Sequence, residues 1–104
     1  MKNRVSVIKK YKRNPGIILD AGCGDGVFLK EMKRGGWHAL AIDSSAASRE
    51  YLSENNISLV SDGFLSAQIK KGALDVVTFW YSFEHLRDPS SHIQQAYKVL
   101  KEDG

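Results

Sequence analysis

The chain has 104 residues, enough for one domain with a buried core but few for an α/β sheet domain. Its composition is typical of a globular protein, and no apolar run approaches the roughly 18 residues that a membrane span needs. Residues 1–10 are basic and lack the apolar segment of a signal peptide. Cys23 is the single cysteine, which excludes an internal disulfide and a zinc site built from cysteine pairs. We therefore expect one cytoplasmic domain.

The net charge of +3 is unevenly distributed along the chain. Six basic residues precede the first acidic one, and the remainder carries nine basic and twelve acidic side chains. The six are Lys2, Arg4, Lys9, Lys10, Lys12 and Arg13. A basic arm can bind nucleic acid, but this one offers no platform for base stacking. We interpret it as the solvated face of a helix and expect no nucleic-acid partner.

Hydrophobic spacing and turn residues predict helices and strands that alternate along the chain. Helices are expected over 3–13, 25–34, 46–54, 64–71 and 89–101, and strands over 17–21, 37–42, 57–60 and 74–81. The run 74–81 is the most β-prone, and we expect both of its faces to be covered. Asp88 before Pro89 predicts the N-terminal cap of the last helix. That helix is expected to turn four residues to the core, namely Ile93, Ala96, Tyr97 and Leu100.

Four strands that alternate with helices predict an α/β fold with a doubly wound parallel sheet. In such sheets the ligand binds beyond the carboxyl ends of the strands, where the strand order reverses. Three acidic residues, Asp20, Asp43 and Asp62, fall at or near these ends. We therefore expect a ligand site along this edge.

Residues 17–29 predict a strand, a tight turn and the start of a helix. Glycines alternate in the turn at Gly22, Gly24 and Gly26, where glycine permits positive φ and lets a ligand approach the main chain. The dinucleotide fingerprint would need its third glycine at position 27, which is Val27. Asp20 would repel phosphate but can accept hydrogen bonds from a cationic amino group. The turn is thus predicted to hold a ligand with a cationic amino group rather than a diphosphate.

The two later acidic residues each allow two interpretations. Asp43 lies 21 residues after Gly22, where a carboxylate can accept both hydroxyls of a ribose. It could instead cap the following helix, although the next residue, Ser44, can fill that role. Asp62 with Gly63 could meet an adenine amino group or could simply form a turn.

Together these residues resemble class I S-adenosylmethionine-dependent methyltransferases, a group that includes small-molecule O- and C-methyltransferases of quinone biosynthesis. The matching motifs are ILDAGCGDG at 18–26, AIDSS at 41–45, SDG at 61–63 and LDVVTFWYSFEHLRDP at 74–89. The resemblance implies a Rossmann-like methyltransferase fold. It also implies methyl transfer from S-adenosylmethionine to a small-molecule acceptor, with S-adenosylhomocysteine as the other product.

The resemblance also implies roles for individual residues. Asp20, Gly22 and Gly24 would surround the methionine part of the cofactor, and Asp43 would hold the ribose. Asp62 and Gly63 would flank the adenine. The remaining expected cofactor contacts are Phe28, Ser44, Trp80 and Tyr81.

Methyl transfer is an in-line displacement, so the protein must chiefly align the reactants and exclude water. Glu84 and His85 form the one acid–base pair in the motifs, and His85 could deprotonate an acceptor hydroxyl. A structural role is the alternative. The pair offers too few ligands for a metal, so no metal is expected.

The family's sheet has seven strands in the order 3-2-1-4-5-7-6, so the resemblance covers its cofactor-binding half. We expect residues 1–104 to be a single, incomplete domain, truncated after about four strands and the following helix. The fourth strand would then lie at an exposed edge that favours self-association. Two alternatives remain open: a non-catalytic module that binds an adenosyl cofactor, and a fragment of an NAD(P)- or FAD-binding oxidoreductase, which Val27 disfavours.

Overall fold

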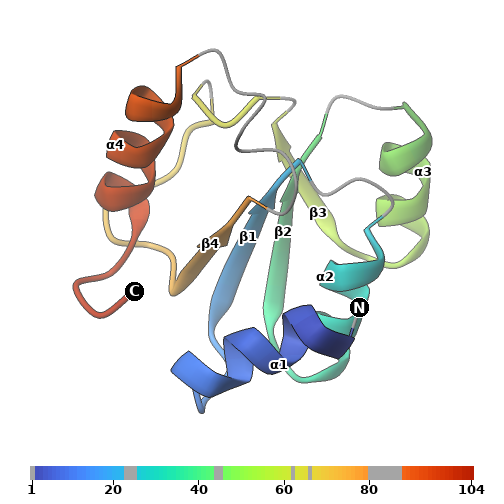
Figure 1. Ribbon diagram of the computed structural model, residues 1–104. Coiled ribbons are helices and arrows are strands. Elements are labelled where there is room, and N and C mark those ends of the chain that lie inside the picture. Colours follow the sequence, from blue (N-terminus) through green and yellow to red (C-terminus); the bar gives the residue numbers. More distant parts are fainter. Residues whose placement is uncertain (1, 23–25, 44–45, 62, 66, 80–87) are drawn as a thin grey trace.

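The structure is a computed structural model that describes residues 2–22, 26–43, 46–61, 63–65, 67–79 and 88–104. Its elements in chain order are α1 (Lys2–Tyr11), β1 (Ile17–Ala21), α2 (Val27–Arg34), β2 (His38–Ile42), α3 (Ala46–Glu54), β3 (Ser58–Ser61), β4 (Val76–Thr78) and α4 (Pro89–Val99). The strands form one parallel sheet in the order β3-β2-β1-β4 (Figure 1). The predicted doubly wound α/β fold is confirmed.

Strand β1 lies between β2 and β4 and is apolar on both faces. Ile18 belongs to the core on one face and Leu19 to the core on the other, and both side chains are fully buried. Alternate side chains of a strand point to opposite faces, and a covered parallel sheet needs apolar residues on both. The sequence of β1 therefore suits the interior of the sheet.

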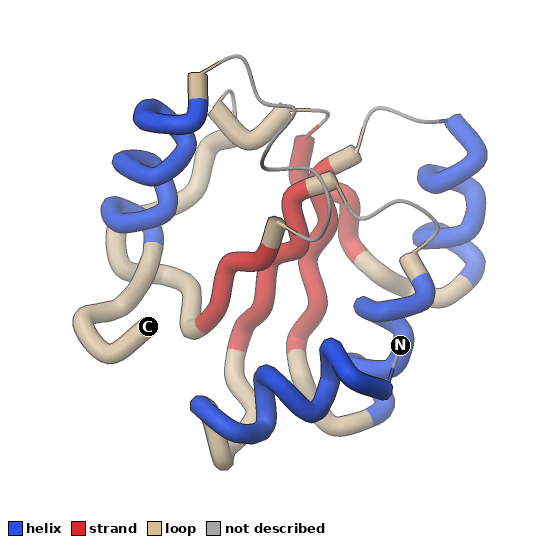
Figure 2. The backbone as a smooth tube through the Cα atoms, in the orientation of Figure 1, coloured by secondary structure: helices blue, strands red, loops and turns tan. Residues whose placement is uncertain are grey.

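Helices α1, α2 and α3 contribute to the core on one face of the sheet. Its buried members are Ile8, Ile18, Phe28, Leu29, Met32, Trp37, Ala39, Ala41, Leu52 and Ile57. The opposite face is covered by α4 and by the segment that leads to β4 (Figure 2). Its buried members are Leu19, Ala21, Ile42, Phe64, Ala67, Leu74 and Val99. Connections on both faces are what a doubly wound sheet requires.

The prediction of a helix over 64–71 is wrong for the residues that the structure describes there. They form turns and irregular backbone, with Ala67 N–H donating to the Phe64 carbonyl at 3.2 Å. Phe64 and Ala67 are buried, and Ile69 is half-buried between exposed neighbours. Burial that alternates over 67–70 suits an extended backbone, and Gly72 at φ 69° then turns the chain.

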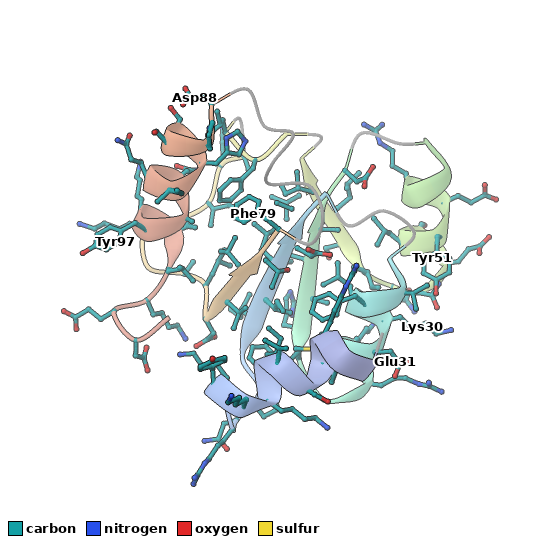
Figure 3. All side chains as sticks on the ribbon, viewed as in Figure 1. Lys30, Glu31, Tyr51, Phe79, Asp88 and Tyr97 are labelled. Carbon is teal, nitrogen blue, oxygen red and sulfur yellow. The ribbon has the colours of Figure 1, made fainter. Side chains whose placement is uncertain are left out.

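The predicted inner face of α4 is partly wrong. Ala96 and Leu100 pack against the core as expected, but Ile93 is 57% exposed and Tyr97 86% exposed. Figure 3 shows Tyr97 pointing away from the sheet. Val99, which the prediction omitted, is fully buried. The buried stripe is therefore rotated around the helix relative to the prediction.

The cap of α4 is confirmed. The Asp88 carboxylate accepts hydrogen bonds from the Ser91 N–H at 3.2 Å and the Ser91 hydroxyl at 2.7 Å. Beyond the helix, Leu100 pairs with Leu74 at an isolated parallel bridge, and Lys101 N–H donates to the Leu74 carbonyl at 2.8 Å. The chain thus returns to the start of β4 along its outer side.

Asp75 joins this C-terminal segment to the sheet. Its Oδ2 accepts a hydrogen bond from Ile17 N–H at 2.8 Å and one from Lys101 Nζ at 3.3 Å. The Ile17 hydrogen bond, with a smaller contribution from Lys101, holds the pKa of the Asp75 carboxyl below its usual value. A Cβ at Gly16 would lie 2.2 Å from the same oxygen, so a side chain at this position would displace the Asp75 carboxylate.

Candidate functional site

The glycine turn follows β1 at the carboxyl edge of the sheet. Gly22 has φ 77°, is exposed, and donates its N–H to the Ile42 carbonyl at 2.7 Å. This hydrogen bond extends the β1–β2 pairing by one residue before the chain turns. Gly24, predicted as a cofactor contact, lies outside the described residues. The exposed main chain at Gly22 suits the close approach of a ligand.

Gly26 ends the turn and forms the N-cap of α2 with φ 80°. A Cβ there would lie 3.0 Å from Tyr51 Cδ1 and 3.1 Å from Leu52 Cδ2. Glycine at this position therefore permits both the left-handed backbone and the close packing of α3. Gly26 thus lies close against α3 and makes no side-chain cap hydrogen bond.

Asp20 and Thr78 meet where the strand order reverses. They lie opposite each other in the β1–β4 register, and Thr78 Oγ1 donates to Asp20 Oδ1 at 2.7 Å. The Asp20 side chain is only 1% exposed, and Thr78 is also buried. Since ligands of doubly wound sheets bind at this reversal, the buried carboxylate marks the centre of the candidate site.

The electrostatics of Asp20 are unusual for a carboxylate. Burial raises its pKa to about 6, against the lowering effects of the Thr78 hydrogen bond and the Arg4 charge. The charge of Asp43 raises the pKa slightly further. At neutral pH Asp20 is thus an ionised, buried group whose charge is only partly compensated, and it would bind a cation favourably.

Arg4 reaches this region from α1. Ile8, one helical turn later, is buried in the same core as Ile18, and Ile18 shares a strand face with Asp20. The C-terminal end of α1 lies at the amino ends of the strands. Lys12, which follows α1, lines one hollow together with Asp75, the residue before β4. Arg4 therefore faces the carboxyl edge, which agrees with its effect on the Asp20 pKa.

Sequence reasoning missed both Arg4 and Thr78. Thr78 could have been noticed as the one aliphatic hydroxyl in the predicted strand 74–81. Arg4 precedes Ile8 by four residues and so lies on the inner side of α1. It is one of six basic residues in this segment, and the sequence does not distinguish it from the other five.

The structure brings together only some of the predicted site residues. Asp43 is half-buried directly after β2 and adjoins Ile42, whose carbonyl binds Gly22. Gly63 is half-buried beside Phe64. Phe28 is 1% exposed within the core, so its contact with a cofactor stays a prediction. The other predicted site residues lie outside the described part of the chain: Gly24, Ser44, Asp62, Trp80, Tyr81 and His85.

Two further expectations concern metals and membranes. Among the described residues, no three His, Cys, Asp or Glu side chains gather closely enough to hold a metal ion. In the same part of the chain, no helix combines the length and apolar character needed to cross a bilayer.

A parallel sheet of order β3-β2-β1-β4 defines a Rossmann-like α/β domain, and the buried Asp20–Thr78 pair marks its candidate ligand site at the carboxyl ends of β1 and β4. The sequence model of one family, described as a methyltransferase domain, matches residues 1–104. The chain belongs to this methyltransferase domain family.

Curated relatives support the assignment. The chain is 33% identical over 98 residues to a ubiquinone biosynthesis O-methyltransferase of Actinobacillus pleuropneumoniae, covering 84% of this chain and 42% of the relative. It is 30% identical over 95 residues to the enzyme of that name from Acinetobacter baumannii, covering 84% of this chain and 40% of the relative. The chain thus spans about two fifths of the length of these relatives.

Solved structures share the fold. A Pyrococcus horikoshii protein superposes with a TM-score of 0.84 at 23% identity, over 99% of this chain and 54% of its own. The geranyl diphosphate C-methyltransferase of Streptomyces coelicolor, solved with S-adenosylhomocysteine, superposes with a TM-score of 0.79 at 18% identity, over 96% of this chain and 42% of its own. At these identities the likeness concerns the fold alone.

Proposed function

We propose that residues 1–104 form the S-adenosylmethionine-binding unit of a cytoplasmic methyltransferase that acts on a small-molecule acceptor. The observation that carries the proposal is Asp20, an ionised carboxylate buried near the end of β1, two residues before the exposed Gly22. Membership of the methyltransferase domain family supports the same cofactor.

The described residues fit the amino-acid end of this cofactor. Asp20 uses one carboxylate oxygen for Thr78, and an ammonium group would compensate its remaining charge. Arg4, whose charge already acts on Asp20, would bind the α-carboxylate. The ammonium group and the α-carboxylate of the cofactor would thus pair with Asp20 and Arg4, respectively.

The remaining contacts follow the strand ends. Asp43 would accept the ribose hydroxyls, and Asp62 with Gly63 would flank the adenine. The backbone near Trp80 and Tyr81 would border the sulfonium. When bound, S-adenosylmethionine supplies an electrophilic methyl group; the protein's part is to orient it and exclude water. His85 is proposed to take the proton of an acceptor hydroxyl.

Isothermal titration calorimetry with S-adenosylhomocysteine, and with NAD as the comparison, tests the cofactor assignment. We expect binding of S-adenosylhomocysteine alone, weakened at least about tenfold in Asp20→Asn because a charge-assisted hydrogen bond is lost. Glu50→Gln, which removes an exposed carboxylate from α3, should bind as the parent does. Preference for NAD, or equal binding by Asp20→Asn, would contradict the assignment.

We also propose that copies of the chain associate through the outer edge of β4. Among the described residues, the backbone hydrogen bonds to the C-terminal segment come from Gly72 and Leu74, before β4 begins, and β4 itself pairs with β1. Unpaired strand edges tend to recruit further strands. Light scattering over a concentration series should give a mass that rises above 11.6 kDa, and a constant monomer mass would refute the idea.

A further inference from the structure

A second charged feature lies at the opposite edge of the sheet from Asp20. Where α1 and α2 meet, a hollow of about 280 Å³ is bordered by Lys9, Lys12, Arg13 and Arg34, with Glu31 as its one acidic side chain. Pro15 and Trp37, which precede β1 and β2, also line it. The hollow therefore sits at the amino ends of these strands, away from the glycine turn.

Two of the four cations around the hollow already have partners. Arg34 forms an ion pair with Glu31, in which the guanidinium lies 3.1 Å from the Glu31 carboxylate. Lys12 Nζ donates to the backbone carbonyl of Asp103. Within the described part of the chain, Lys9 and Arg13 make no hydrogen bond or ion pair. Lys9 and Arg13 thus border the hollow with charges that no described residue compensates.

The shape of the hollow limits its ligand. Its volume is at the small end of the range for ligand sites, so it suits a compact anionic group rather than a whole nucleotide. Trp37 is 7% exposed and provides an apolar wall, next to which a charge interaction is stronger than in open water. Arginine presents paired donors that match phosphate oxygens, and lysine adds a point charge.

We propose that this hollow binds the phosphate group of an anionic ligand, either a small phosphorylated molecule or the headgroup of an anionic lipid. Lys9 and Arg13 are the principal contacts, because their charges have no partner among the described residues. Lys12 and Arg34 complete the positive field. The site is separate from the cofactor site and does not depend on the methyltransferase proposal.

Calorimetry with inorganic pyrophosphate at low salt tests the site on the full chain. We expect binding that the double variant Lys9→Gln/Arg13→Gln weakens about tenfold or more, since two charge-assisted contacts are lost. The matched control is Lys70→Gln/Lys71→Gln, which removes two exposed lysines near the β4 connection. It lowers the net charge equally and should bind pyrophosphate as the parent does. Circular dichroism would confirm that both variants fold.

Sedimentation with vesicles separates the two sources of phosphate. Binding to phosphatidylcholine vesicles with 30% phosphatidylglycerol, and not to phosphatidylcholine alone, would assign a lipid headgroup if Lys9→Gln/Arg13→Gln abolishes it. Pyrophosphate binding without vesicle binding would assign a small phosphorylated molecule. No binding to either probe, or equal weakening by the control variant, would overturn the proposal.

Discussion

At the scale of single residues, Asp20 combines a cost to stability with a use in binding. Its pKa is raised from 3.8 to about 6, so the folded chain holds this proton over a pH range in which the unfolded chain has released it. The free energy of unfolding therefore decreases as the pH rises from about 4 to above 6. The shift corresponds to about 3 kcal/mol, an order-of-magnitude figure.

Asp20→Asn should remove this pH dependence. The amide is neutral and its oxygen can still accept a hydrogen bond from the Thr78 hydroxyl, so we expect the variant to gain up to about 3 kcal/mol over the parent at pH 7.5 and about half of that at pH 5. Urea denaturation at the two pH values measures the difference. Glu50→Gln provides the control, and an unchanged pH slope in Asp20→Asn would contradict the burial argument.

Gly26 is the residue on which the packing of α3 against the glycine turn depends. Gly26→Ala should lose about 2 kcal/mol or more, because its φ of 80° disfavours a side chain and the new Cβ would press on Tyr51 and Leu52. Gly35→Ala is the matched control, since Gly35 has φ −81° and its nearest contact would be 3.4 Å away. Thermal unfolding should separate the two, and equal midpoints would refute the prediction.

At the level of helices and strands, the bounds were predicted best where the sequence pattern fits only one type of element. The apolar run of β1 and the spacing of α3 gave the observed bounds. The inner face of α4 was misjudged because His92 counts as polar by type. Its ring actually lies 6.0 Å from that of Phe64 and 6.3 Å from that of Phe79, inside the aromatic contacts that cover the sheet. His92 is half-buried, and residue type alone does not reveal that its ring takes part in these contacts.

Two substitutions on α4 test its orientation. Val99→Ala should lose about 1–3 kcal/mol, because Val99 is fully buried and truncation leaves a cavity. Tyr97→Ala removes far more side chain but should change the free energy of unfolding by less than about 0.5 kcal/mol, since Tyr97 is 86% exposed. Urea denaturation measures both, and a larger loss in Tyr97→Ala would support the rejected orientation.

At the scale of the whole molecule, the position of the site was predictable but its full composition was not. Asp20 and Gly22 lie at the carboxyl edge, as expected from the strand pattern. Thr78 and Arg4 join them only through the folding of distant segments, and Thr78 is 58 residues from Asp20 in the sequence. A single sequence does not specify which distant side chains meet.

Asp75 is the corresponding junction at the amino edge, where β1, β4 and the C-terminal segment meet. Asp75→Asn keeps an acceptor for Ile17 N–H but loses the charge that binds Lys101, so we expect a loss of about 1 kcal/mol at pH 7. The Asp75 pKa is lowered, so its contribution is present above the ordinary carboxylate range and is lost as the pH falls below it. The gap between variant and parent should therefore shrink on acidification.

Urea titrations of the Asp75→Asn variant and the parent at pH 7 and pH 3.5 check this expectation. Asp103→Asn serves as the control. The Asp103 backbone carbonyl accepts the hydrogen bond from Lys12 Nζ, so the variant keeps this contact. A gap that widens at low pH would contradict the assigned role of Asp75.

The 58-residue separation of Asp20 and Thr78 also has a consequence for the order of folding. Strands β1, β2 and β3 are joined by short crossovers, whereas β4 must close a much longer loop to reach β1. During synthesis, β1 to β3 can therefore assemble while Asp20 is still hydrated and has an ordinary pKa. Arrival of β4 brings Thr78 to Asp20, so we expect the candidate site to form only after β1 to β3 have assembled.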